Sequence, residues 1–409
     1  MLQRRKHMSK STDQEPNKEP SKSNGIFNLA DDAINGIADI VEQLHQSVVA
    51  KALGNSKGAK LINEITGRVI KNTRKITSFV SSGADQLLEK FGDKYQGTAS
   101  STKKDAILSA LNGVVGDYLV DRDNSLAIKM QFRLHGKSLS TNELLAIAQN
   151  GGGKLIIMVH GLCMNDRQWQ RNEHDHGAEL AKELGCGLIY LHYNTGRHIS
   201  ENGQCFDELM TSFIKDISSE IDVFVIAHSM GGLVTRSAFY YAQQLNHNWL
   251  NCVSKVIFLG SPHHGAPLEK GGNWIDFLLS TNSHSSAFTK LTQIRSNGIT
   301  DLRYGNIIAQ DWQQSEKFVL SRDQRLPTPL PENVLCFAVA TISSKVANIV
   351  TKSVLGDGLV PLNSALGHHK DKQFDLNIPE DRKWIGKNIN HLDMLSDLTV
   401  YKTITAWIK

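Results

Sequence analysis

Residues 223–234 read Val223-Phe224-Val225-Ile226-Ala227-His228-Ser229-Met230-Gly231-Gly232-Leu233-Val234. The first five residues are apolar and mostly β-branched at consecutive positions, as in a strand that is buried on both faces of a parallel sheet. Two glycines follow, and then apolar residues resume. The stretch therefore predicts a buried strand, a sharp turn with Ser229 at its tip, and the start of a helix.

Ser229 and its small neighbours match the second half of the nucleophile-elbow pattern Gly-x-Ser-x-Gly. The serine of such a turn has a strained backbone, so the residues two positions before and after it must be small. Here they are Ala227 and Gly231. We expect Ser229 Oγ to act as a nucleophile and the Met230 N–H to be one donor of an oxyanion hole. The alternative is that Ser229 only caps the helix.

Length and composition limit the class of protein. The chain has 409 residues, which predicts one large catalytic domain and an appendage. It is 40% hydrophobic and 21% charged, as soluble globular proteins are, and no apolar run approaches the roughly 18 residues of a membrane helix. A net charge of +4, evenly spread, gives no reason to expect a nucleic-acid partner. The first 24 residues have no apolar segment of the kind found in secretory signals, so we expect a cytoplasmic protein.

The cysteines favour neither a metal site nor a disulfide framework. There are five, and no two of them form a Cys-x-x-Cys pair. They are Cys163, Cys186, Cys205, Cys252 and Cys336. We therefore expect reduced, mostly buried thiols.

The N-terminal part of the chain divides into a polar tail, residues 1–24, and a helical extension, residues 25–125. The tail is rich in charged residues and lacks residues that could anchor a core, so it is expected to be disordered. In the extension, apolar residues recur at helical spacing over 26–48, 61–80 and 106–120. Packing of these helices on the catalytic domain is the ordinary interpretation. The many Lys and Arg residues of the second helix leave open a peripheral contact with a membrane.

Residues 126–409 form the expected catalytic domain. Strands are predicted at 126–134, 155–159, 187–191, 223–227, 253–259 and 334–339, and helices at 206–218, 233–245 and 392–408. Alternating strands and helices predict an α/β fold, with a mostly parallel sheet that has helices on both faces.

A serine hydroxyl needs a base, and the base needs a group that orients it. On an elbow of this kind, the acid and then the histidine follow the serine along the chain. Asp357 lies between two glycines, after the strand predicted at 334–339, and His391 comes 34 residues later, just before the last predicted helix. His368 and His369 follow Asp357 too soon to leave room for a strand between them. The alternatives are a turn aspartate and a surface histidine.

A second oxyanion donor is expected from the loop after an early strand, where His160-Gly161-Leu162 stands, and we assign it to the Leu162 N–H. His263 and His264 follow the strand after Ser229, at the same edge of the sheet. The residues expected to shape the substrate pocket are His160, Gly161, His228, His263 and His264.

Four stretches together resemble the motifs of bacterial lipases and esterases of the α/β-hydrolase superfamily. They are His160-Gly161, Ala227-His228-Ser229-Met230-Gly231-Gly232, Gly356-Asp357-Gly358-Leu359-Val360-Pro361 and Asn390-His391-Leu392-Asp393. The stretch Ser261-Pro262-His263-His264-Gly265 further resembles the branch that includes GPI inositol deacylase-like hydrolases. The resemblance covers about residues 153–409 and leaves the N-terminal helices out.

The resemblance implies an α/β-hydrolase fold and a serine carboxylic-ester hydrolase of the lipase or esterase type. Ser229 would attack, His391 would transfer the proton and Asp357 would hold His391, through an acyl-enzyme, on lipid-like or medium-chain acyl esters. It also implies a cap or lid at about 268–331, a polar stretch that nevertheless contains Trp274, Phe277 and Phe288. These aromatic residues could equally pack on the core.

We expect neither a cofactor nor a metal. Asp393 occupies the position that helps to bind calcium in some bacterial lipases, but one carboxylate is far short of the six or more oxygen ligands that calcium takes. The stretch Glu173-His174-Asp175-His176 is interpreted as a polar loop. The expected partner is a small-molecule or lipid ester.

The same residues leave other functions open. A triad of this kind serves acyl transfer to an alcohol other than water and the cleavage of thioesters or polyesters. An alternative from another class is a scaffold without catalysis that binds at a membrane surface.

Overall fold

The computed structural model of the chain describes residues 101–215, 217, 220–266, 296–313, 323, 325–343 and 356–409. The tail, the helices expected at 26–48 and 61–80, and most of the cap expected at 268–331 lie outside these residues. They stay predictions, and so does the division of the chain into a tail, an extension and a catalytic domain.

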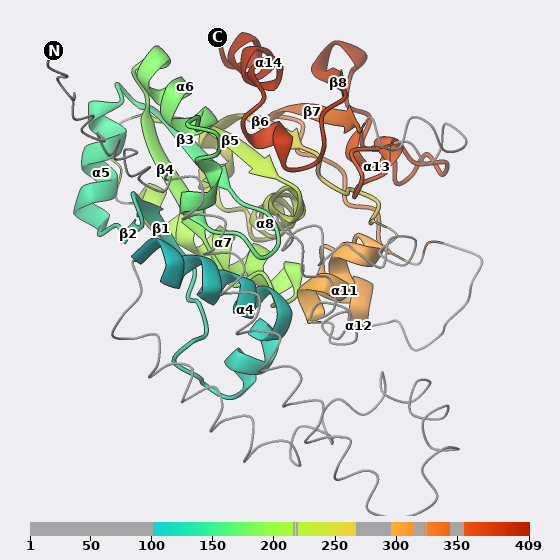
Figure 1. Cartoon of the computed structure of the whole chain (residues 1–409), viewed down its shortest axis with the longest axis horizontal. Helices are drawn as coiled ribbons and strands as arrows, with labels where there is room; N and C mark the ends of the chain where they lie inside the picture. Colours follow the sequence, from blue (N-terminus) through green and yellow to red (C-terminus); the bar gives the residue numbers. More distant parts are fainter. Residues whose placement is uncertain are drawn as a thin grey trace, which may run out of the picture.

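The described residues are built on one eight-stranded sheet with the order β2-β1-β4-β3-β5-β6-β7-β8 (Figure 1). Its strands are β1 (Gln131–Leu134), β2 (Lys137–Ser138), β3 (Lys154–Val159), β4 (Gly187–His192), β5 (Asp222–His228), β6 (Val253–Leu259), β7 (Leu335–Ile342) and β8 (Lys383–Lys387). β1 is antiparallel to β2 and to β4, and the strands from β4 to β8 are parallel. The predicted, mostly parallel α/β sheet is confirmed.

The order of the strands reverses beside β3. The chain passes from β3 to β4 on one side and then returns to β5 on the other side. In open parallel sheets, ligands bind at the carboxyl ends of the strands where such a reversal opens a crevice. His160 follows β3 and Ser229 follows β5, so the fold brings both motifs to this point.

Helices cover both faces of the sheet. They are α4 (Ser101–Asp121), α5 (Thr141–Asn150), α6 (His176–Leu184), α7 (Ile199–Lys215), α8 (Met230–Leu245), α11 (Asn297–Tyr304), α12 (Ala309–Gln313), α13 (Leu362–Ala365) and α14 (Leu398–Ile408), with short 3₁₀ turns at Asp166–Trp169, Asn248–Cys252, Glu380–Arg382 and Asp393–Leu395.

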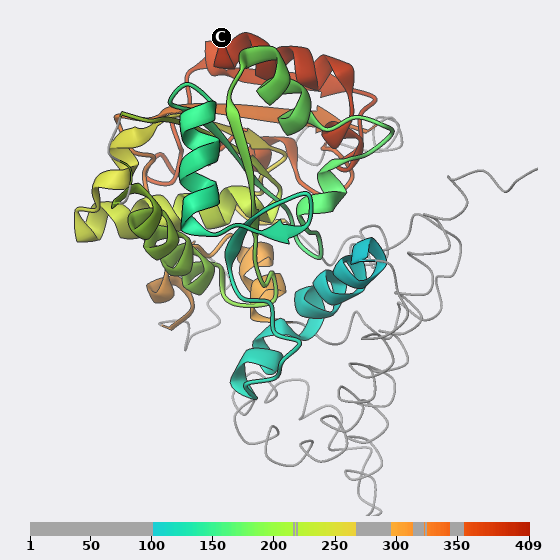
Figure 2. The same cartoon turned by 90° about the vertical axis from the view of Figure 1, so that its left-hand side faces the viewer.

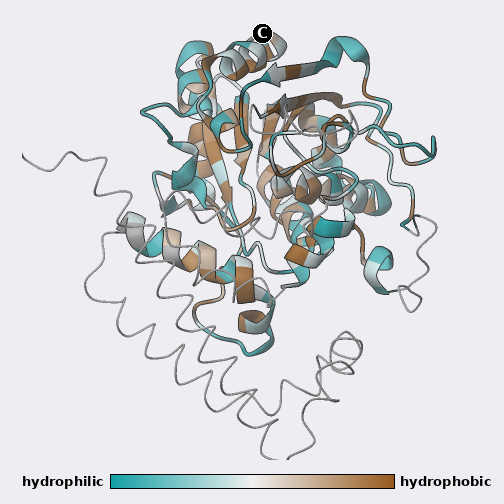
Figure 3. Cartoon of the chain, turned by 45° about the vertical axis from the view of Figure 1, so that its right-hand side comes forward, coloured by the Kyte–Doolittle hydropathy of each residue, from teal (hydrophilic) through white to brown (hydrophobic). Residues whose placement is uncertain are grey.

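Alternate side chains of each strand point to opposite faces, which gives two apolar clusters. Leu155 and Ile157 of β3 belong to the cluster under α4, α5, α7 and α8. Ile156 and Met158 belong to the cluster under α6 and α14. Figures 1 and 2 show these two groups of helices on opposite sides of the sheet, and Figure 3 shows the hydrophobic residues concentrated between them.

Several element bounds differ from those expected. The strand expected at 126–134 forms only at Gln131–Leu134. The closing helix begins at Leu398 because the Asp397 side chain caps it, accepting from the Thr399 and Val400 N–H groups. The expected polar loop at Glu173–His176 is in part the start of α6, since Asp175 accepts from the Ala178 N–H as the N-cap. Within the described ranges, no helix is both long enough and apolar enough to cross a membrane.

The helix expected at 106–120 forms as α4 and packs on the sheet domain. Its residues Leu111, Val114 and Leu119 are fully buried in the same cluster as β3 and β5. Near its start, Asp105 Oδ2 lies 3.0 Å from Arg133 Nη2 and 3.0 Å from Arg167 Nε. α4 is therefore fixed to the domain by its apolar face and by a network of partly buried ion pairs.

The middle of α4 lies against the turn that follows β3. A methyl group added to Gly113 would lie 2.2 Å from Cys163 Sγ, so only glycine lets the helix come this close. Ser296 Oγ, just before α11, donates to the Gly113 carbonyl at 2.7 Å. α4 thus bridges the turn at Cys163 and the start of α11.

Asp117 of α4 gives a testable pH dependence. Its Oδ2 accepts from the Asn297 N–H at 2.9 Å. Burial, with Asp121 adding to it, raises the pKa of Asp117 to about 6 from its ordinary 3.8. Between these values the folded protein binds more protons than the unfolded chain does. The contribution of this group to stability is therefore present below about pH 4 and is lost as the pH rises through about 6.

Asp117→Asn keeps an oxygen that can accept from Asn297 and removes the charge. We expect the variant to exceed the wild type in free energy of unfolding at pH 7 by roughly 1–3 kcal/mol and to match it near pH 4. Thermal unfolding of both proteins across this pH range measures the difference. Parallel curves for the two proteins from pH 4 to 7 would contradict the assignment.

Candidate active site

Ser229 joins β5 to α8 in a strained conformation. Its φ is 54° and its ψ is −124°, and a positive φ costs a residue other than glycine about 1–3 kcal/mol. The serine stands at the N-cap of α8, but its side chain makes no capping hydrogen bond. Its N–H donates to the Leu259 carbonyl of β6 at 2.9 Å. Helix capping therefore does not account for this residue, and the strained turn presents its side chain at the end of the sheet.

Two glycines give this turn its room. A methyl group on Gly231 would lie 2.4 Å from the Val159 carbonyl oxygen, so α8 could not approach the end of β3 with any other residue there. A methyl group on Gly161 would lie 3.0 Å from Ser229 Cβ. The turn after β3 and the turn after β5 are thus in contact.

Asp357 and His391 form a buried hydrogen-bonded pair. His391 Nδ1 lies 2.7 Å from Asp357 Oδ2, and the exposed fractions of the two residues are 0% and 1%. The other carboxylate oxygen, Oδ1, accepts from the N–H groups of Leu359 and Val360 at 2.9 and 2.8 Å. Because a carboxylate can only accept, Nδ1 carries a proton, and in the neutral form of this imidazole Nε2 has a free lone pair.

The backbone at the end of β6 brings Ser229 and His391 together. The Ser229 N–H bonds the Leu259 carbonyl, and the next residue, Gly260, faces the pair. A methyl group on Gly260 would lie 3.2 Å from His391 Nδ1 and 3.1 Å from Asp357 Oδ2. Gly260 was not singled out from the sequence. The signal for it is a glycine at the end of the strand that follows the elbow.

The side chains of Ser229 and His391 each end in an atom without a partner. Among the described residues, neither Ser229 Oγ nor His391 Nε2 has a hydrogen bond, although both atoms are buried. These are the two atoms that nucleophilic catalysis would couple by proton transfer. Catalytic hydrogen bonds are often long without substrate, so their separation here is compatible with that role.

His228 supports the loop of His391. Its Nε2 lies 3.1 Å from the His391 carbonyl oxygen, to which it donates, and the two rings lie 4.6 Å apart. Burial, with His391 adding to it, lowers the pKa of His228 well below its ordinary value. His228 is therefore neutral at pH 7 and holds the backbone of His391 in place.

Two backbone N–H groups, those of Met230 and Leu162, are candidates for an oxyanion hole. Met230 is the first residue of α8, where an N–H has no intrahelical acceptor and lies at the positive end of the helix. On the turn after β3, the Cys163 N–H is already used, because it donates to Thr195 Oγ1 at 3.1 Å. This leaves the neighbouring Leu162 N–H as the candidate donor on that turn.

His160, expected in the substrate pocket, is fully buried. Its Nδ1 donates to the Gly161 carbonyl at 2.9 Å, and its ring stacks on Tyr193 at 4.5 Å. The Tyr193 hydroxyl in turn donates to the His160 carbonyl at 2.7 Å. Burial lowers the pKa of His160 to about 4, so the ring is neutral at pH 7. These contacts fix the backbone ahead of Leu162.

His263 and His264 were expected to shape the substrate pocket, which stays a prediction. His263 is fully buried against the edge of Phe258, with ring centroids 4.7 Å apart. Together with His264 it lines a hollow whose lining includes neither Ser229 nor His391.

Asp393, the position compared with a calcium ligand, accepts a hydrogen bond from the Asn390 side-chain amide.

The five cysteines are all free thiols: Cys163 and Cys336 are buried, and the others are partly buried. The expectation that most of them are buried holds for only two of the five.

The model of one protein family, described as the PGAP1-like alpha/beta domain, matches residues 150–355, half of the chain. This chain belongs to that family. The PGAP1-like match begins at the end of α5 and ends just before the loop of Asp357. It includes Ser229 and the turn at Leu162, and it leaves out Asp357 and His391. A search of curated proteins finds no match to the chain.

Solved structures with a similar arrangement include lipases. Mature lipase BlEst2 of Bacillus licheniformis is 17% identical, over 62% of this chain and 91% of its own, with a TM-score of 0.41. Lipase B of Aspergillus fumigatus is 15% identical, over 92% of this chain and 83% of its own, with a TM-score of 0.36. An alpha/beta hydrolase superfamily protein of Enterococcus faecalis is 14% identical, over 63% and 90%, with a TM-score of 0.36. Likenesses of this extent leave the reaction to be argued from the site itself.

Proposed function

We propose that this PGAP1-like domain is a serine carboxylic-ester hydrolase in which Ser229, His391 and Asp357 form the catalytic triad. The observation that carries the proposal is the strained Ser229 at the end of β5, beside a buried His391–Asp357 pair with a 2.7 Å hydrogen bond. A binding scaffold has no need of a strained serine or of an imidazole held in one tautomer. The backbone strain is accounted for if the serine reacts.

In the proposed reaction, Ser229 Oγ attacks the ester carbonyl carbon while its proton passes to His391 Nε2. The Met230 and Leu162 N–H groups stabilise the oxyanion of the tetrahedral intermediate. The carbon–oxygen bond to the alcohol breaks, and the alcohol leaves with the proton from His391 Nε2. Water then attacks the acyl-enzyme with the same nitrogen as base, which releases the acid and restores Ser229.

The substrate class in this proposal is a lipid-like or medium-chain acyl ester, handled by a protein of the cytoplasm that makes peripheral contact with membranes. The same steps would serve transfer to another alcohol, and analysis of the products with competing alcohols present separates transfer from hydrolysis. The membrane part has a test of its own. Membrane contact would be contradicted if co-sedimentation with liposomes changed neither with the content of anionic lipid nor on deletion of residues 26–100.

The first test of the function is labelling by a fluorophosphonate probe, which reacts with activated serines. We expect the wild type to be labelled and Ser229→Ala not to be. In parallel, p-nitrophenyl esters of increasing chain length should show turnover with a maximum that outlines the acyl site. Ser138→Ala, a change on exposed β2, is the matched control and should be labelled like the wild type.

Two outcomes would count against the proposal. A folded wild type that stays unlabelled even with detergent or lipid present would favour a scaffold. Equal labelling of the wild type and Ser229→Ala would place the reactive serine elsewhere.

A further inference from the structure

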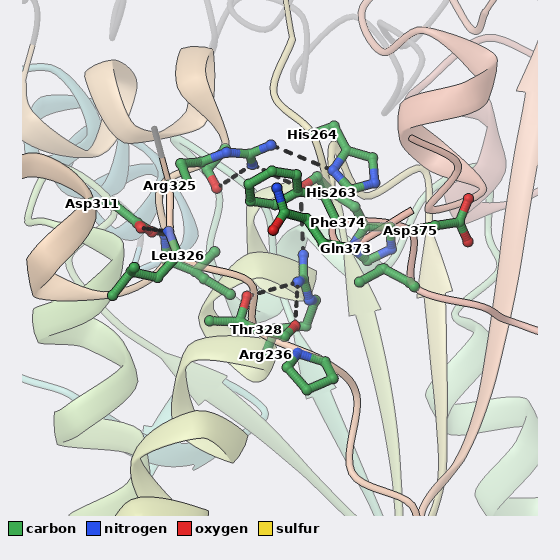
Figure 4. Close-up of a pocket in the computed structure, with 14 residues that line it drawn as sticks. Arg236, His263, His264, Asp311, Arg325, Leu326, Thr328, Gln373, Phe374 and Asp375 are labelled. Carbon is green, nitrogen blue, oxygen red and sulfur yellow. Dashed lines mark hydrogen bonds between the residues drawn. The ribbon is translucent and has the colours of Figure 1, made fainter. Parts of the chain in front are cut away.

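A hollow lined by two arginines lies beside α8, apart from the candidate active site (Figure 4). Its wall is formed by the loop after β6, by residues 325–329 and by residues 373–376. Its empty volume is about 330 Å³, part of it open to solvent. The hollow therefore offers room for a small polar group beside the two arginines.

Arg236 of α8 is a buried cation whose acceptors are all neutral. Its exposed fraction is 6%. Nη2 donates to the carbonyl and hydroxyl oxygens of Thr328 at 3.0 and 3.1 Å, and Nη1 lies 3.4 Å from the His263 carbonyl oxygen. Nε is buried and has no partner among the described residues. A buried charge without a counterion is costly, so this arrangement calls for an explanation.

Arg325 brings a second cation to the same carbonyl. Its Nη1 lies 3.3 Å from the His263 oxygen, so both guanidinium groups donate to one acceptor. Arg325 has its own counterion, because Nη2 lies 2.6 Å from Asp323 Oδ2. Burial and the neighbouring Arg325 lower the pKa of Arg236 to about 9. Two like charges thus converge at the hollow, and Arg236 has no carboxylate paired with it among the described residues.

The two carboxylates in the lining are engaged elsewhere. Asp311 accepts three backbone N–H bonds of 2.9 to 3.2 Å. Asp375 accepts the N–H groups of His369 and Asn377, and Figure 4 shows its carboxylate turned away from Arg236. Asp311 acts on Arg236 only through space. The hollow therefore keeps a cationic centre that a ligand can reach.

We propose that this hollow binds an oxyanion, a phosphate or a phosphate-like group, through the guanidinium groups of Arg236 and Arg325. Guanidinium forks match the geometry of phosphate oxygens and form charge-assisted hydrogen bonds with them. The anion supplies the missing counterion of Arg236. The opening of the hollow allows the group to be free phosphate or the end of a larger molecule. Neither the fold family nor the proposed hydrolysis assigns such a site.

Binding is tested with the full chain and inorganic phosphate, by calorimetry and by thermal unfolding, against chloride at equal ionic strength. The wild type should be stabilised by phosphate and not by chloride. Arg325→Gln should lose the effect. Arg236→Lys keeps the positive charge but removes the planar guanidinium that can bind two oxygens at once, and it should weaken phosphate binding by about tenfold or more. Arg122→Gln, just after α4 and outside the lining, should bind as the wild type does.

Vesicles distinguish the two sources of the anion. Co-sedimentation with phosphatidylcholine vesicles that contain phosphatidic acid, lost in Arg325→Gln, indicates a lipid headgroup. Phosphate binding without vesicle binding indicates a free anion. The proposal is overturned if phosphate affects the wild type no more than chloride does, or if it stabilises all four proteins equally. Ester hydrolysis enters none of these readouts, so a failure here is distinguishable from a failure of the proposed function.

Discussion

Replacing Ser229 by alanine, replacing His391 by alanine, and making both changes together are expected to lower kcat by about the same factor, roughly 10⁴ to 10⁶. Neither residue contributes to the reaction without the other, because Ser229 needs His391 Nε2 to accept its proton and because Nε2 contributes to the reaction only through this proton transfer. Ser229 Oγ and His391 Nε2 are both buried and have no hydrogen-bond partner among the described residues. Steady-state kinetics on the best p-nitrophenyl ester measures all three variants.

Two surface changes control for this experiment. Ser138 and His135 are exposed at the far edge of the sheet, so Ser138→Ala and His135→Ala should leave kcat unchanged. If the losses of Ser229→Ala and His391→Ala instead multiply in the double variant, the two residues act independently, and the shared proton transfer is wrong.

Asp357→Asn is expected to lower kcat by roughly 10³ to 10⁴. The reason lies in the two backbone N–H groups, of Leu359 and Val360, that Asp357 Oδ1 accepts. An asparagine must keep its carbonyl oxygen there, so its amide NH₂ faces His391 Nδ1. The imidazole must then accept on Nδ1 and carry its proton on Nε2, where it cannot act as a base toward Ser229.

The pH profile separates this explanation from a simple loss of structure. Because the variant has the wrong tautomer, raising the pH should not restore its rate, while its thermal unfolding should stay near that of the wild type. Asp381→Asn, an exposed aspartate in the turn before β8, is the matched control. An Asp357→Asn enzyme with normal turnover would mean that the orienting acid lies elsewhere.

Local patterns in the sequence predicted what depends on neighbours in the chain. The strand, turn and start of a helix around Ser229 were predicted from a stretch of 12 residues. β6 was predicted with its observed bounds, Val253–Leu259. The Asp357–His391 contact joins residues 34 apart, and it was predicted only because the order of such residues along the chain is fixed in this fold. Their contact is seen, whereas their roles remain to be tested.

What the sequence did not predict depends on contacts distant in the chain or on weak patterns. β8, Lys383–Lys387, is polar at both ends and lies at the edge of the sheet, so it has little apolar signal. α5 was not predicted, although Ser140 and Glu143 form a capping box, which is a sequence signal for the start of a helix. The contact of Gly113 with Cys163 spans 50 residues, and nothing near either residue reveals it. His263 follows a strand toward the active-site edge, yet its ring is buried against Phe258.

The close fit of α4 against Cys163 determines where the protein can be shortened. The family match begins at residue 150, but a polypeptide cut there would lack the helix whose buried face completes the main apolar cluster. It would also leave the turn that carries Leu162 without its neighbour, so the damage would reach the chemistry as well as the stability. The place for a boundary in engineered versions is therefore ahead of residue 101, so that α4 stays with the sheet that it covers.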